Sequence, residues 1–210
     1  MPQSFAERIR NEAINYAYSY QHNFADYEFA IFSGIFQHHQ YYILNFQPQN
    51  YLHLIGVNSL ISPSDFFQRC YNKTLTLDDF DFNKGKNPKS TQGSVRRKIN
   101  ALAGLINLFS SPIYVQEDFK KNNVACALAT TDANLYTLGM VNNQKHQNVL
   151  YPMSLMKGYQ IDKTKQGAVD LVLKRTLGQP LFDKIVVGNK ELLDLYLNNG
   201  ISISTSPKID

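Results

Sequence analysis

The sequence predicts an α+β fold, in which a helix-rich N-terminal half packs on a mainly antiparallel sheet from the C-terminal half. Helical apolar periodicity is concentrated before residue 110, and short alternating apolar runs are concentrated from Val124 onward. Elements segregated in this way are typical of α+β proteins and not of doubly wound parallel sheets. At 210 residues the chain fits one domain, with an N-terminal helix over 1–22 and a frayed tail over 204–210.

Helix-start signals place several helices in the first half. Ser4 and Glu7 form a capping box, in which each side chain accepts a hydrogen bond from the other's backbone N–H. Ser62 followed by Pro63 is a second start, with serine as the N-cap and proline at the first helical position. The predicted ranges are about Phe5–Gln21, a short helix or turn over Asn50–Val57, a helix over Ser62–Tyr71, and a short helix from Thr76.

The segment 83–93 (NKGKNPKSTQG) is predicted to be a mobile loop because it carries no apolar side chain. The clearest helix is then predicted to begin after Ser94 and to end near Pro112. Its apolar residues step by four, three, four and three positions, which makes a single stripe. They are Val95, Ile99, Leu102, Ile106 and Phe109.

Strands are predicted where apolar runs are bounded by turn residues. Two lie early in the chain, and the polar connection between them contains His38 and His39, which are interpreted as surface-loop residues. A terminal helix over Glu191–Asn198 is predicted to end at Gly200. The predicted strands are Tyr27–Phe36, Tyr41–Phe46, Val124–Thr130, Leu135–Val141, Val149–Tyr151, Ala168–Arg175 and Lys184–Val187.

Charge and targeting signals narrow the possible functions. The net charge of +4 permits an anionic partner, and the segment Lys84–Lys98 carries six Lys or Arg residues and no acid. Such a local basic patch suits an active site that handles phosphate. The N-terminus has no signal-peptide pattern, and no apolar run is long enough to span a membrane, so a cytoplasmic protein is expected.

Several common active-site signatures are absent from the sequence. It has no glycine-rich phosphate loop, no His-Glu-x-x-His motif and no nucleophile elbow. Cys70 and Cys126 are far apart and are expected to be reduced, partly buried thiols. These observations argue against nucleotide triphosphatases, dinucleotide enzymes, zinc hydrolases and α/β-hydrolases, and they predict a protein without a metal or other cofactor.

His53 is the histidine with the most informative surroundings. It lies in the apolar segment Tyr51–Val57, just after a predicted strand and turn. Imidazole titrates near neutrality, so a histidine held here can act as an acid or a base. A buried histidine whose nitrogens are satisfied by structural hydrogen bonds is an equally good interpretation.

Cations and hydroxyl groups elsewhere complete a candidate phosphate site. Arg96, Arg97 and Lys98 lie in the first turns of a predicted helix, where cations are unfavourable by a few tenths of a kcal/mol each. That cost suggests an anion site, although a solvated basic face explains the same pattern. Further hydroxyl and cationic groups are offered by Thr131, Ser154 and Lys157.

Four short motifs together resemble a phage-associated branch of the barnase–EndoU–colicin–RelE-like nuclease superfamily. They are Tyr51–Gly56 (YLHLIG), Arg97–Ile99 with the apolar stripe that follows, Leu138–Gly139 in a hairpin, and Pro152–Leu155 (PMSL). The resemblance covers about Tyr41 to Val187. It implies a small antiparallel sheet with helices on one side.

The resemblance also implies metal-independent RNA cleavage, in which the ribose 2′-hydroxyl attacks the adjacent phosphate. His53, Arg97 and Ser154 would then be the catalytic residues, and Arg96, Lys98, Lys157 and Thr131 would bind substrate. No acidic residue lies near these motifs, so His53 would have to be the base. A toxin or effector of a phage or mobile element is expected, with RNA as substrate and an antitoxin or immunity protein as a possible partner. The alternative is an inactive nucleic-acid- or protein-binding module on the same fold.

Overall fold

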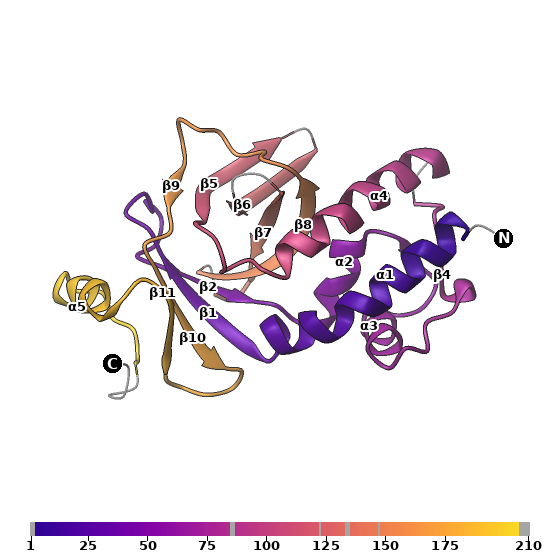
Figure 1. The fold of residues 1–210 in the computed structure, drawn as a ribbon. Coiled ribbons are helices and arrows are strands. Elements are labelled where there is room, and N and C mark those ends of the chain that lie inside the picture. The colour runs from indigo at the N-terminus through magenta and orange to yellow at the C-terminus, as the bar shows by residue number, and fades with distance from the viewer. Residues whose placement is uncertain (1–2, 85–86, 122, 133–134, 147, 206–210) are drawn as a thin grey trace.

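The computed structural model describes residues 3–84, 87–121, 123–132, 135–146 and 148–205. Helices come mainly from the first half of the chain and strands mainly from the second, so the α+β class is confirmed (Figure 1). The helices are α1 (Phe5–Tyr20), the π-helix η1 (Gln21–Ala25), the 3-10 helix η2 (Pro48–Asn50), α2 (Tyr51–Ile55), α3 (Pro63–Tyr71), the 3-10 helix η3 (Leu77–Asp79), α4 (Pro88–Leu105) and α5 (Lys190–Asn198).

The first and third α-helices begin where the sequence predicts. In α1 the Ser4 hydroxyl accepts a hydrogen bond from the Glu7 backbone, and the Glu7 carboxylate accepts one from the Ser4 backbone. In α3 the Ser62 hydroxyl accepts from the backbone of Asp65. Caps of this kind each stabilise a helix by about 1 kcal/mol.

Helix α4 begins seven residues earlier than predicted. Its N-cap is Asn87 and not Ser94, because the Asn87 side chain accepts hydrogen bonds from the backbone of Lys89 and Ser90 and Pro88 fills the first turn. The expected mobile loop over 83–93 is therefore helical from Pro88 onward, while 85–86 lie outside the described residues. Exposed polar residues suffice for these first turns once an asparagine cap and a proline are in place.

The main sheet has nine strands in the order β11-β10-β1-β2-β8-β7-β6-β5-β9. Neighbouring strands are antiparallel except for β2 and β8, which are parallel. The strands are β1 (Tyr27–Phe32), β2 (Tyr42–Asn45), β5 (Tyr114–Lys121), β6 (Val124–Thr131), β7 (Tyr136–Asn142), β8 (Val149–Lys157), β9 (Gly167–Ala168), β10 (Leu171–Thr176) and β11 (Lys184–Val187). A second, two-stranded sheet pairs β3 (Asn58–Ser59) with β4 (Phe80–Asp81).

The predicted early strands β1 and β2 pair with each other and lie within the main sheet, between β10 and β8. One of the longer strands differs from the prediction. Strand β5 was not predicted, because its charged residues interrupt the apolar alternation, and antiparallel pairing with β6 holds it in place. This unpredicted strand carries Glu117 and Asp118.

The sheet curls until its β9 end meets the connection that follows β1. The Ser33 hydroxyl donates to the Ala168 carbonyl at 2.5 Å, and the Asp170 backbone donates to Phe32 at 2.9 Å. A Cβ at Gly167 would lie only 2.6 Å from the Ile35 side chain, so glycine permits this approach. The curl brings β5 next to the β1–β2 connection, although β8, β7 and β6 separate β2 from β5 in the sheet.

Helices α1–α4 cover one face of the sheet and share the main hydrophobic core with it (Figure 1). Aromatic rings dominate this core, and Tyr20, Tyr51 and Phe67 contact one another within it. Helix α5 packs instead on a smaller cluster formed with Phe32 and Leu173. The resemblance implied that all helices lie on one side of the sheet, and this is wrong. Alternate residues of β1 belong to the two clusters, so helices pack on both faces.

Cys70 and Cys126 are free, buried thiols, as predicted. Within the described ranges, no helix is long and apolar enough to cross a membrane. Ser204 and Thr205, expected to be frayed, pair with Phe182, while 206–210 lie outside the described residues.

Candidate active site

His53 and Lys98 are brought together where α2 meets α4. The Lys98 ammonium donates to the His53 backbone carbonyl at 2.5 Å and lies against Gly56, the residue that ends α2. Burial, with a contribution from Lys84, lowers the pKa of Lys98 to about 8. Burial, followed by Lys84 and Lys98, also lowers the pKa of His53. This pair therefore places a cation beside a histidine, and Lys98 also caps the carbonyl end of α2.

The two arginines of α4 point away from this pair. Successive helical residues turn by about 100°, so Arg96, Arg97 and Lys98 leave the helix in three directions. The Arg96 guanidinium lies 5.4 Å from the ring centre of Phe5 on α1. Arg97 is exposed and lies back along its own helix near Gly93. The basic run is thus divided among α1, solvent and α2.

Ser154 lies on the other face of the sheet from His53. It pairs with Gly139, where a Cβ would meet the sulfur of Cys126 and the Cβ of Ser154. Cys126 belongs to a small separate cluster, whereas the neighbouring Leu155 belongs to the core shared with the helices. His53, Arg97 and Ser154 therefore do not converge in one cleft.

The other two predicted substrate-binding residues are also dispersed. Thr131 is completely buried, and its hydroxyl donates to the Tyr136 carbonyl at 2.6 Å. Lys157 is exposed at the end of β8. A substrate that reached His53 would have no exposed surface of Thr131 to contact.

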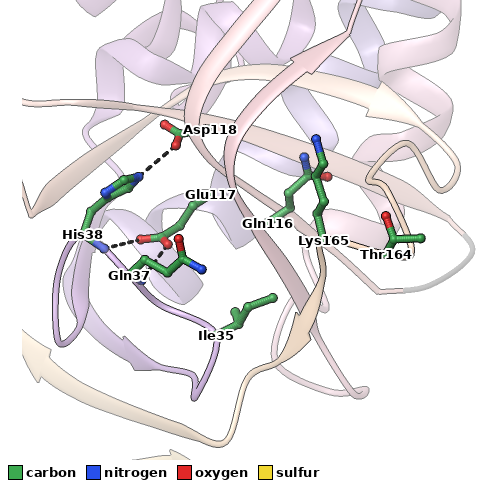
Figure 2. Close-up of a pocket in the computed structure, with 8 residues that line it drawn as sticks. All are labelled: Ile35, Gln37, His38, Gln116, Glu117, Asp118, Thr164 and Lys165. Carbon is green, nitrogen blue, oxygen red and sulfur yellow. Dashed lines mark hydrogen bonds and ion pairs between the residues drawn. The ribbon is translucent and has the colours of Figure 1, made fainter.

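A different group of polar residues surrounds a cavity of about 360 Å³ between the β1–β2 connection, β5 and the turn before β9 (Figure 2). The connection contributes Gln37 and His38, and β5 contributes Glu117 and Asp118. These elements meet because the sheet curls, as described above. The residues that line the cavity are Ile35, Gln37, His38, Gln116, Glu117, Asp118, Thr164 and Lys165.

Glu117 is held by the connection that it faces. Its carboxylate accepts hydrogen bonds from the Tyr42 hydroxyl at 2.6 Å, the Gln37 backbone at 2.8 Å and the His38 backbone at 3.4 Å. Burial and the hydrogen bond to Glu117 raise the pKa of Tyr42, which keeps its hydroxyl a donor. With both oxygens of Glu117 occupied, this residue fixes the position of the loop that carries His38.

His38 and Asp118 form the exposed acid–base pair of the pocket. The His38 Nε2 atom lies 2.8 Å from a carboxylate oxygen of Asp118, and Figure 2 shows the ring and the carboxylate pointing toward each other. The hydrogen bond to Asp118, followed by the charge of Glu117, raises the pKa of His38. The imidazole of His38 therefore keeps its proton to higher pH than an isolated histidine does, and in that form it can donate a proton.

Asp118 occupies an unusual backbone conformation. Its φ is +50°, in the left-handed region that aspartate tolerates better than most residues. The pairing of β5 with β6 skips this residue, since Glu117 pairs with Leu128 and Phe119 with Cys126. Its side chain is 73% exposed, so one strained residue presents a carboxylate at the pocket.

The local sequence contained only weak signals for this pocket. Two adjacent histidines in a polar connection are typical of a surface loop, and two acids in a charged segment are typical of a solvated edge. Glu117 and Asp118, which hydrogen-bond to His38, are 79 and 80 positions away from it along the chain. In the described part of the chain, no group of three or more His, Cys, Asp or Glu side chains is placed to hold a metal ion.

Comparison with known proteins identifies a family. No curated protein and no solved structure matches the chain. Residues 14–183 match the family described as phage-Barnase-EndoU-ColicinE5/D-RelE like nuclease4. That range includes both histidine sites and all of the main sheet except β11. The chain therefore belongs to the phage-Barnase-EndoU-ColicinE5/D-RelE like nuclease4 family.

Proposed function

We propose that this protein is a ribonuclease that cleaves RNA without a metal ion, and that the pocket of His38, Glu117 and Asp118 is its active site. Membership of a nuclease family supports the class of reaction. The observation that carries the site is the His38–Asp118 pair, 2.8 Å apart at the edge of a cavity, with a raised histidine pKa. An acid and a carboxylate are thus present together, which the sequence motifs alone did not supply.

The proposed reaction uses the ribose as its own nucleophile. The Asp118 carboxylate accepts the proton of a 2′-hydroxyl, whose oxygen forms a bond to the adjacent phosphorus. The bond from phosphorus to the 5′-oxygen of the next nucleotide breaks, and protonated His38 gives its proton to that oxygen. The products are a 2′,3′-cyclic phosphate and a 5′-hydroxyl, and DNA is not cut because it lacks the attacking group.

The remaining pocket residues support these two groups. Glu117 holds the His38 loop through its hydrogen bonds and contributes to the raised pKa of the histidine. Lys165 lines the same cavity and can stabilise the negative charge that builds on the phosphate oxygens. Asp118 has to release His38 when the substrate enters, which its high exposure permits.

The residues predicted from the sequence define a second candidate site for the same reaction. One observation favours it: Lys84 and Lys98 help to keep the pKa of His53 low, so a neutral imidazole base would lie beside two cations. In that proposal Arg97 and Ser154 would have to act from positions that the fold keeps apart, with Arg96 and Lys157 as outlying substrate contacts. The His38 site needs no such rearrangement.

The proposal is tested with purified protein, an RNA and the DNA of the same sequence, both in excess chelator. We expect cleavage of the RNA alone, with cyclic phosphate ends, and loss of cleavage in His38→Ala. Cleavage that disappears with chelator and returns with a divalent ion would overturn metal independence. Binding of RNA without cleavage by the folded protein would favour the alternative, an inactive binding module on the same fold.

The same activity would make the protein a toxin or effector, with an antitoxin or immunity protein as the partner that restrains it. Family membership supports this part of the proposal. Induced expression in a bacterial host should arrest growth and degrade RNA with the wild-type protein, and not with His38→Ala at equal abundance. Equal arrest by both proteins would contradict a role for cleavage in toxicity.

A further inference from the structure

Three neighbouring cavities share Asp118 in their linings, and together they make up what we call the groove. The central cavity shares Gln116, Asp118 and Lys165 with a second cavity of about 510 Å³. It shares Gln37, His38 and Asp118 with a third cavity of about 450 Å³. The pair proposed to carry the chemistry therefore lines the central cavity and has a further cavity on either side of it, which together offer more room than a single nucleotide needs.

One arm of the groove is cationic. Lys120, Lys121 and Lys165 line it, and the first two are exposed at the end of β5. The one carboxylate of this arm other than Asp118 is Asp162, which accepts hydrogen bonds from the backbone and hydroxyl of Thr164. Because the Asp162 carboxylate already accepts hydrogen bonds from Thr164, the three lysine ammonium groups are suited to binding phosphate groups.

The other arm carries aromatic and amide groups. His39 is partly buried, and its ring packs edge-on against Tyr42 with centroids 5.1 Å apart. Gln37 and Asn142 are exposed side chains in the same cavity. A fixed aromatic ring beside two amides is suited to stacking on a base and bonding its edge, the way single-stranded RNA is read.

We propose that this groove binds single-stranded RNA in one direction, with the upstream phosphates on the lysine arm and the base after the cleaved bond on the His39 arm. The direction follows from the positions of the two reacting groups. His38, which would protonate the leaving 5′-oxygen, lines the central and third cavities, whereas Asp118 lines all three. This inference rests on the proposed ribonuclease function for its direction, and on the cavities alone for the binding surface.

The binding surface is tested with a 2′-fluoro RNA octanucleotide, which lacks the attacking hydroxyl and cannot be cut. We expect it to bind the wild-type protein, and we expect Lys120→Gln/Lys121→Gln/Lys165→Gln to weaken binding at least tenfold. The slope of log affinity against log salt should fall by about 0.7 for each lost phosphate contact. The matched control is Lys73→Gln/Lys89→Gln/Lys184→Gln, three exposed lysines that line none of the three cavities.

The direction is tested by cleavage of short RNAs that are lengthened at one end. Upstream nucleotides should raise kcat/KM for the wild-type protein but not for the triple lysine variant. The identity of the base just downstream should affect kcat/KM, and Asn142→Ala should reduce that preference.

The outcomes separate this inference from the proposed function. Lysine-dependent binding of the 2′-fluoro RNA by a protein that cuts nothing would support the groove and overturn the ribonuclease. RNA cleavage in which the triple lysine variant binds and cuts like its control would overturn the groove and the proposed role of Lys165, and it would leave cleavage by the His38–Asp118 pair standing. Failure of the wild-type protein to bind the 2′-fluoro RNA would also overturn the groove.

Discussion

The two histidine sites of this protein differ in what surrounds the imidazole. His53 is half-buried on α2, and burial together with Lys84 and Lys98 lowers its pKa. His38 is exposed in a loop, and Asp118 together with Glu117 raises its pKa. One site therefore favours a neutral ring among cations, and the other favours a protonated ring among carboxylates. Only the second provides a proton donor and a proton acceptor at one cavity.

The difference shows that the apolar context of a histidine is a poor guide to its chemistry. His53 has apolar neighbours in sequence because α2 packs against the sheet, and its carbonyl serves to receive Lys98. His38 has polar neighbours in sequence because it lies in the β1–β2 connection. Its partners Glu117 and Asp118 lie on β5, which the curl of the sheet brings next to that connection. Proton transfer depends on the partners in space and not on the neighbours along the chain.

The largest effect that would sharpen this comparison is expected from Asp118→Asn. Asparagine tolerates the left-handed backbone at φ +50°, so the fold should be kept while the carboxylate is lost. RNA cleavage should fall by about 10²–10⁴-fold, as expected for loss of one acid–base group. Because Asp118 raises the pKa of His38, the alkaline fall in kcat/KM should also move to lower pH in any residual activity.

The pKa of His38 can be followed directly by NMR titration of the two proteins. In Asp118→Asn it should lie closer to its ordinary value of 6.5 than in the wild type. The matched control is Asp65→Asn, an exposed acid on α3 that lines none of the three groove cavities. Cleavage by Asp118→Asn at the wild-type rate would show that Asp118 takes no part in the reaction.

A smaller effect, on stability alone, is expected at the His53 site. Gly56 has a φ of +84°, and a Cβ there would lie 2.7 Å from the Lys98 side chain. Gly56→Ala should therefore lower the free energy of unfolding by about 2–3 kcal/mol, from left-handed strain and overpacking together. Gly178→Ala is the matched control, because its φ is +83° and no atom lies within 4 Å of the added Cβ.

Urea unfolding of the two glycine variants separates the two contributions. The control should lose about 1–2 kcal/mol, from the backbone strain alone. RNA cleavage by the folded Gly56→Ala protein should stay close to wild type if Lys98 and His53 are structural. Equal losses of stability in the two variants would show that Lys98 does not restrict this turn.

The smallest effects are opposite pH dependences of stability at the two histidines. The lowered pKa of His53 gives stability that is present above its ordinary pKa of 6.5 and is lost as the pH falls through the lowered value. The raised pKa of His38 gives stability that is present below 6.5 and is lost as the pH rises through the raised value. Tm should therefore fall less on acidification in His53→Gln than in wild type, and less on alkalinisation in His38→Gln. Curves that keep the wild-type shape would contradict the assigned surroundings.

The sequence predicted elements whose signals are local. Capping residues located α1 and α3, and short apolar runs located most strands, because caps and alternation act within a few residues. Helix α4 begins earlier than predicted because Asn87 and Pro88 start it within a polar segment that has no apolar periodicity. Strand β5 was missed because its pairing partner, and not its own pattern, makes it a strand.

The candidate site was harder to predict because its geometry is set by the curl of the whole sheet. His53 and Arg97 were correctly placed on helices, whereas Ser154 lies on β8 beyond the predicted strand Val149–Tyr151. The face of each strand and the direction of each helical side chain then decide which of these residues meet. Ser154 and Leu155 are adjacent in sequence and lie on opposite faces of β8. The contact between Tyr42 and Glu117 spans 75 positions and leaves no trace in local composition.

The central claim is tested most directly by comparing His38→Ala with His53→Ala in one assay of RNA cleavage, with Tm measured on the same samples. We predict that His38→Ala loses about 10²–10⁴-fold in kcat/KM at nearly unchanged Tm, because an exposed proton donor is removed. We predict that His53→Ala keeps cleavage within about threefold of wild type and changes mainly the Tm, since typical single substitutions shift stability by about 1 kcal/mol. Loss of cleavage in a fully folded His53→Ala, with His38→Ala still active, would contradict the account and place the active site between α2 and α4.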